Sequence, residues 1–127
     1  AEWFTLRDLL RPTLDDRVIW LFSKAISETL RAEVPVTFFR RALIDSGLDP
    51  ETIEPTADEA LLIEFGKALA ADANAVPDEI WTALKARYDE TLLVNLTAFA
   101  GIMVATCVFT NAVKVELDPE LEGYRRR

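Results

Sequence analysis

The longest apolar stretch of the chain runs from Thr91 to Val113 and contains no charged residue and no proline. Asp89, just before it, is a good helix N-cap because its carboxylate can accept hydrogen bonds from the free amides of the first turn. Gly101 is the weak helix former within the stretch. A helix of this length spans about 35 Å. We therefore expect the rest of the chain to be organised around one long helix near its C-terminus.

Polar residues inside this stretch bear on whether it crosses a membrane. An uncharged run of about 18 residues or more is a transmembrane candidate. This run, however, includes five polar residues: Asn95, Thr97, Thr106, Thr110 and Asn111. At about 100° per residue they form two lines on roughly opposite sides of the helix, which suits contact with protein better than contact with lipid. Lys114 follows alone, without the basic cluster that the loop-charge rule would favour. We expect the buried core helix of a soluble protein that has no membrane partner.

Apolar positions spaced by three and four residues predict five further helices. They cover residues 3–10, 14–32, 35–46, about 57–71 and about 78–88. Thr13 is the expected N-cap of the second, Gly47 the expected left-handed residue after the third, and Thr56 with Glu59 the capping box of the fourth. No strand-like alternation appears. The sequence predicts a single all-α domain, residues 1–127, built as a bundle of about six helices, with residues 1–12 as an N-terminal arm and 119–127 as a C-terminal tail.

Composition adds two expectations about partners. Half of the 127 residues are hydrophobic, and the mean hydropathy of +0.11 is high for a small soluble monomer. Surplus apolar surface in so short a chain favours burial between subunits, so we expect a homo-oligomer. The formal net charge of −8 argues against nucleic acid, whose phosphates it would repel. Arg125, Arg126 and Arg127 form a local exception that we interpret as a solvated tail.

The chain is poor in the residues that usually carry chemistry. Cys107 is its one cysteine, so it has no internal disulfide or redox pair, which fits a reducing cytoplasm. Its apolar setting predicts an unreactive thiol with a raised pKa. The chain has no histidine, and so lacks the most frequent general base and metal ligand. We therefore expect neither a metal nor a cofactor.

Two ordered sets of motifs resemble the carboxymuconolactone decarboxylase and alkylhydroperoxidase D superfamily. The first passes from Asp16-Arg17-Val18 through Arg41-Ala42 to Ser46-Gly47-Leu48-Asp49. The second passes from Ala57-Asp58-Glu59-Ala60 across Pro77-Asp78-Glu79 and Tyr88-Asp89-Glu90 to Thr110-Asn111-Ala112-Val113. The resemblance implies a carboxymuconolactone decarboxylase-like helical subunit that forms trimers or hexamers through its long helices. A dimer is the fallback expectation.

The same resemblance implies which chemistry has been lost. Redox members of the superfamily carry a Cys-x-x-Cys-x-x-x-His motif just before the glycine that matches Gly47. Counting back from Gly47, the two thiol positions fall on Ala32 and Pro35 and the histidine position on Phe39. The proton-relaying glutamate of those proteins falls near Trp20. None of these side chains can carry out thiol or proton chemistry, so we expect a related fold without peroxidase activity.

Aromatic residues at and beside these positions are the candidate binding site. Trp20, Phe38 and Phe39 would form an apolar pocket for a small hydrophobic molecule, although core packing alone also explains them. Glu28 and Glu33 are the candidate catalytic groups, because a desolvated glutamate can act as a general base with a raised pKa. A solvated helix face is the alternative for both.

Further candidates could orient a polar group of the ligand. Arg40, with Arg41 beside it, could clamp a carboxylate, and pairing with Asp45 or another surface acid is the alternative. Tyr88 and Asn111 are possible hydrogen-bond donors from other parts of the bundle.

Two classes of function remain open. One is a thiol-independent and metal-independent enzyme that acts on a small, largely apolar substrate by isomerisation, cyclisation, elimination or decarboxylation. The other is a non-catalytic oligomer of the same fold that binds a small molecule or serves as a scaffold. A carboxylate that opens into the aromatic pocket would favour the enzyme.

Overall fold

The computed structural model describes residues 2–125, with side chains from Phe4 onward. This described part contains six α-helices and two 3-10 helices and has no strand. The elements are α1 (Glu2–Leu10), α2 (Asp16–Thr29), α3 (Glu33–Asp45), α4 (Ala57–Asp72), η1 (Ala73–Ala75), α5 (Asp78–Arg87), α6 (Glu90–Ala112) and η2 (Pro119–Tyr124). The predictions of an all-α chain and of a long helix near its C-terminus are confirmed.

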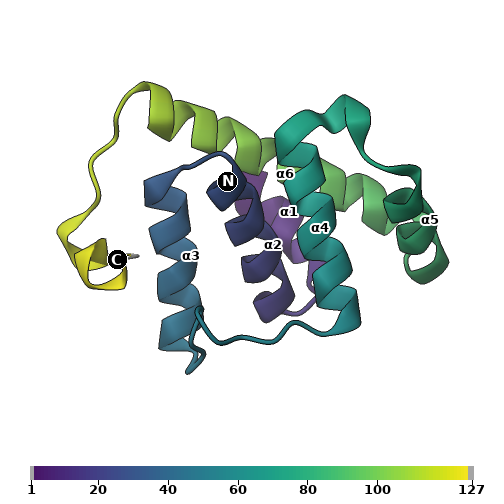
Figure 1. Cartoon of the computed structure of the whole chain (residues 1–127), viewed down its shortest axis with the longest axis horizontal. Coiled ribbons are helices and arrows are strands. Elements are labelled where there is room, and N and C mark those ends of the chain that lie inside the picture. The colour runs from purple at the N-terminus through teal and green to yellow at the C-terminus, as the bar shows by residue number, and fades with distance from the viewer. Residues whose placement is uncertain (1, 126–127) are drawn as a thin grey trace.

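The arrangement is a row of three helices crossed by the long one. Helices α3, α2 and α4 lie side by side, with α2 in the middle (Figure 1). Helix α6 crosses this row and packs against all three, while α1 packs along α6. Helix α5 lies beside the N-terminal end of α6 and contacts α4. The long helix therefore joins the other elements, as the apolar pattern predicts.

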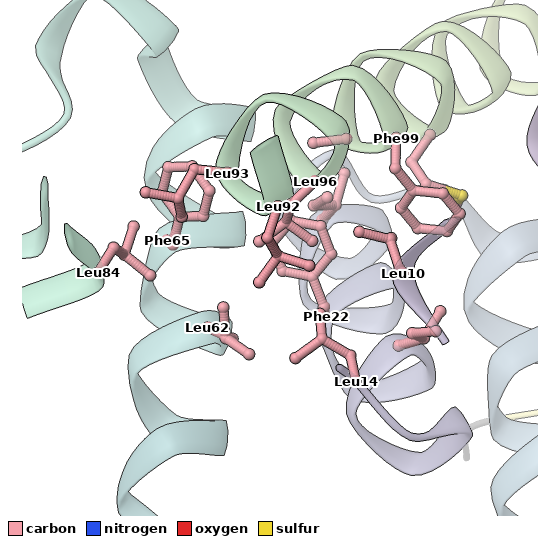
Figure 2. Packing of buried hydrophobic residues seen from close by; sticks show 14 of the residues in the cluster. Leu10, Leu14, Phe22, Leu62, Phe65, Leu84, Leu92, Leu93, Leu96 and Phe99 are labelled. Atoms are coloured by element: carbon pink, nitrogen blue, oxygen red, sulfur yellow. The ribbon is translucent and has the colours of Figure 1, made fainter. Parts of the chain in front are cut away.

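The core forms where α2, α4 and α6 meet (Figure 2). Phe22 of α2 lies between Phe65 of α4 and Phe99 of α6, with ring centroids 6.1 and 6.5 Å away. Gly66 allows this approach, because a Cβ atom there would lie 3.2 Å from the Phe22 ring and 3.3 Å from Ile26. The close contact between α2 and α4 depends on this glycine.

The ends of the helices follow local rules with one exception. Thr56 and Glu59 form both hydrogen bonds of the expected capping box, and Gly47 has φ of 90° after α3, as expected. The prediction of Thr13 as N-cap of α2 is wrong, because Asp15 accepts the hydrogen bond of Val18 N instead. Thr13 N donates to Leu10 O in the turn that closes α1, so this residue belongs to the preceding element.

The burial expected for α6 holds for one face only. Helix α6 is long and apolar enough to cross a membrane, and 39% of its apolar 18-residue window is buried by the rest of the chain. Val94, Val108 and Phe109 are about three-fifths exposed, at 60%, 58% and 61%. The rest of the chain thus leaves an apolar face of α6 uncovered.

The segment expected to be a C-terminal tail includes a structured element. Helix η2 packs against α3, and its Leu121 is buried. Arg40 Nε donates to Tyr124 O at 2.8 Å, and Tyr124 OH donates to an Asp45 carboxylate oxygen at 2.9 Å. Of the tail arginines, Arg125 is described, whereas Arg126 and Arg127 lie outside the described residues, as does the Trp3 side chain.

Candidate functional site

An apolar hollow of about 370 Å³ lies where α1, α3, α6 and the C-terminal segment meet. Its volume falls in the range of about 300–1,000 Å³ typical of small-molecule sites. The lining residues are Phe4, Val34, Pro35, Phe38, Phe39, Met103, Thr106, Thr110, Asp118 and Leu121. We call this feature the apolar hollow.

Two adjacent phenylalanines of α3 form one wall of the apolar hollow. Phe38 and Phe39 meet edge to face, with ring centroids 5.2 Å apart and an interplanar angle of 88°. Phe39 is anchored in the core at 2% exposure, whereas Phe38 is 48% exposed. The expected aromatic pocket therefore contains one fixed ring and one that a ligand could cover.

The polar groups of the apolar hollow are few. Thr106 Oγ1 donates to Ile102 O, and Thr110 Oγ1 donates to Cys107 O, so each hydroxyl is bonded to its own helix. Asp118 contributes the one carboxylate among the lining residues, and this residue is exposed. The hollow therefore offers shape and apolar contact, with one acidic group at its edge.

Trp20 does not join the two phenylalanines. Its side chain is partly buried and packs against the core cluster, and it is not among the residues that line the apolar hollow. The face of α2 that carries Trp20 packs against the core. The structure thus brings together Phe38 and Phe39 but leaves Trp20 apart from them.

The two candidate glutamates lie in a neighbouring groove of about 350 Å³ that Arg31 and Arg125 also line. Glu28 forms an ion pair with Lys24 at 2.9 Å, one helical turn earlier. Glu33 forms an ion pair with Arg125 and is exposed. Neither carboxylate lines the apolar hollow, so neither is placed to abstract a proton from a ligand bound there.

The other candidates are distributed over three places. Arg40 is 9% exposed and is held by Tyr124 O and by the Glu51 carboxylate, while Arg41 pairs with Asp45 at 3.5 Å. Arg40 thus ties α3 to the segments around it. The Arg41 pair matches the alternative in which these arginines bind surface acids.

Tyr88 and Asn111 lie toward opposite ends of α6. Tyr88 lines a groove between α5 and α6, and burial, followed by the charge of Asp58, raises the pKa of its hydroxyl. Asn111 Nδ2 donates to Leu30 O at 2.9 Å and joins the C-terminal ends of α2 and α6. Asn111 also lines a second hollow of about 650 Å³, which we call the polar hollow.

Cys107 is a packing residue in this structure. Its side chain is fully buried, and its thiol lies 3.7 Å from Ser27 Oγ. Burial raises the pKa of the Cys107 thiol, and the contact with Ser27 offsets this only in part. The predicted raised pKa is confirmed.

Several lining residues of the apolar hollow went unrecognised in the sequence. Met103, Asp118 and Leu121 belong to the long helix and to the segment after it, far along the chain from α3. One sequence signal could have indicated that Asp118 and Leu121 belong to a packed segment. Leu121 is an apolar side chain two residues after Pro119, in the segment that we interpret from the sequence as a tail. Their meeting with α3 depends on tertiary packing, which local periodicity does not report.

Comparisons of the chain with protein-family models, curated proteins and solved structures find no match. Within the part of the chain that the structure describes, no three metal-ligating side chains gather in one place.

Proposed function

We propose that the protein binds a small, largely apolar molecule in the apolar hollow. The observation that carries this proposal is the half-exposed ring of Phe38 beside the fixed ring of Phe39, at the wall of a hollow large enough for a small molecule. Covering an exposed ring with a ligand favours binding by roughly 25 cal/mol per Å² of apolar surface removed from water. Neither a thiol nor a metal is needed for such binding.

An enzyme that uses the same hollow is the second candidate. The resemblance to carboxymuconolactone decarboxylase-like proteins supports it, as does the Asp118 carboxylate at the edge of the hollow. In this version Asp118, rather than Glu28 or Glu33, would move a proton during isomerisation, cyclisation, elimination or decarboxylation. Asp118 is exposed to solvent in the free protein. The geometry therefore supports binding better than catalysis.

Titration with an uncharged fluorescent probe such as 1-aminoanthracene tests the binding proposal. Phe38→Ala should weaken binding by about 1 kcal/mol, or roughly fivefold, because the ring is half covered before the ligand arrives. Phe109→Ala is the matched control, since that ring is also exposed but does not line the hollow. Equal effects of the two substitutions would show that the probe binds general apolar surface and would contradict the proposal.

We further propose that the exposed face of α6 is covered by a second copy of the chain. Seven exposed residues on this face alternate at spacings of three and four, as in a helix–helix seam: Thr91, Val94, Ala98, Gly101, Ala105, Val108 and Ala112. All are uncharged, and the small residues at the centre permit close approach of another backbone. Such a seam supports a homo-oligomer over the lipid-facing alternative.

The order of residues along this stripe favours an antiparallel pair. Val94 and Val108 lie seven residues before and after Gly101, with Ala98 and Ala105 between. A two-fold axis near Gly101 would therefore set Val94 of one copy against Val108 of the other. Dimers and hexamers can contain two-fold contacts of this kind, whereas a simple three-fold ring does not.

A further inference from the structure

The polar hollow adjoins the apolar hollow. Val34 and Thr110 line both, so the two hollows meet at these two side chains. The combined space runs from the phenylalanines of α3 to the place where α2 and α6 end. This adjacency bears on which ligands could fit both hollows.

Cations without acidic partners gather in the polar hollow. Of the lysines and arginines in the described residues, only Arg31, Lys85 and Lys114 lack an ion pair within 4 Å. Arg31 and Lys114 both line the polar hollow, although the chain as a whole is strongly acidic. Two of the three unpaired cations therefore lie beside the proposed ligand site.

The backbone places both cations in the same way. Arg31 and Lys114 each follow the end of a helix with positive φ, at 53° and 55°. In each case the next residue closes the turn, with Ala32 N donating to Ser27 O and Val115 N donating to Thr110 O. This is the usual left-handed ending of a helix, here formed by residues other than glycine.

Acidic groups and helix C-termini also border the polar hollow. Glu33 and Glu122 line the polar hollow and share the single positive charge of Arg125, and Glu116 is the third acid there. Helix C-termini repel anions through their free carbonyl groups. Here those of Ser27, Leu30 and Thr110 already accept hydrogen bonds, the second from Asn111. The lining thus carries three cations and three acids, and Arg31 and Lys114 are the two cations without an ion pair.

We propose that the two hollows form one site for a small amphiphilic carboxylate, with its apolar body against Phe38 and Phe39 and its carboxylate between Arg31 and Lys114. This assignment rests on the proposed binding function and adds the chemical class of the ligand. Arg31 supplies a planar fork that matches a carboxylate, and Lys114 supplies a second positive charge.

The test uses two probes of the same shape that differ in charge, 4-phenylbutyrate and 4-phenylbutyramide, titrated by calorimetry at neutral pH and low salt. The carboxylate should bind the unmodified protein roughly tenfold more tightly than the amide, about the size of one charge-assisted hydrogen bond. The double variant Arg31→Gln with Lys114→Gln should remove this preference and leave amide binding unchanged. Lys85→Gln, at the unpaired cation outside both hollows, is the matched control and should retain the preference.

The outcomes distinguish this proposal from the proposed binding of an apolar molecule in the apolar hollow. Equal affinities for the two probes, or a preference that survives in the double variant, would overturn the amphiphilic site and leave apolar binding standing. Failure of both probes to bind the unmodified protein would overturn both proposals.

Discussion

At the scale of single residues, surroundings decide chemistry more than residue type does. Cys107 could be recognised from the sequence as unreactive because its neighbours in the helix are apolar, and the structure adds complete burial. Glu28 and Glu33 could not be placed in this way. Their partners Lys24 and Arg125 compete for the carboxylates, and the second of these pairs depends on where the C-terminal segment folds.

Redox inactivity is the first prediction at this scale. Because Cys107, the one cysteine of the chain, is fully buried with a raised pKa, we expect no turnover of organic hydroperoxides with a thiol reductant. A coupled assay on the purified protein measures this. Turnover that disappears in Cys107→Ala would contradict it.

Acid sensitivity of one buried ion pair is the second prediction. Burial alone would raise the pKa of Glu59, but hydrogen bonds from Arg17 and from Thr56 N outweigh it and hold the pKa below the ordinary value of 4.5. A carboxyl group with a lowered pKa stabilises the fold fully above that value and loses this contribution as the pH falls below it. We expect Glu59→Gln to destabilise the protein at neutral pH, and less so at about pH 3.5.

Urea unfolding of wild type and variant at the two pH values measures the difference. Glu64→Gln, an exposed glutamate of the same helix, is the control and should change little at either pH. A Glu59→Gln effect of equal size at both pH values would show that the lowered pKa does not contribute to stability.

At the scale of elements, the predicted helices agree closely with the structure because their signals are local. Apolar spacing, the capping box at Thr56 and the glycine at position 47 all act within a few residues of the helix they define. The N-cap of α2 was misplaced because Thr13 and Asp15 are both good caps, and only the turn after α1 chooses between them. The docking of η2 on α3 was missed because it is a tertiary contact.

The contact between α2 and α4 gives a prediction at this scale. Gly66→Leu should destabilise the protein by about 1–3 kcal/mol, because the new side chain would clash with Phe22 and Ile26 in a packed core. Lys67→Leu, at the next and half-exposed position of α4, is the matched control and should have little effect. Thermal or urea unfolding measures both, and similar stabilities for the two variants would contradict the close packing.

At the scale of the whole molecule, the exposed face of α6 is the feature that the sequence only partly anticipates. The long uncharged run predicts a helix in contact with other protein, and the rest of the chain supplies that contact on one side. The exposed face of the helix is the one that we propose a second copy covers. Periodicity alone could not show which residues would remain outside, because that depends on where α1 to α5 pack.

Disruption of the stripe on α6 should change the size of the particle. Ala105→Glu places a charge at the centre of the proposed seam and should shift an oligomer toward monomer in light scattering at micromolar concentration. Ala71→Glu, the same substitution at an exposed alanine of α4, should leave the mass unchanged. A monomeric wild-type protein would contradict the second-copy proposal, and a wild-type protein that needs detergent would favour a membrane partner.

The most direct test of the proposed binding function is the NMR signal of Met103. The chain has one methionine, which is 2% exposed and lines the apolar hollow, so a methyl-labelled sample gives one methionine signal at the wall of that hollow. Addition of 1-aminoanthracene should shift the Met103 methyl resonance progressively until it saturates at the same concentration as the probe's fluorescence. A probe that binds by fluorescence while the Met103 signal stays unchanged would place the ligand elsewhere and contradict the proposed site.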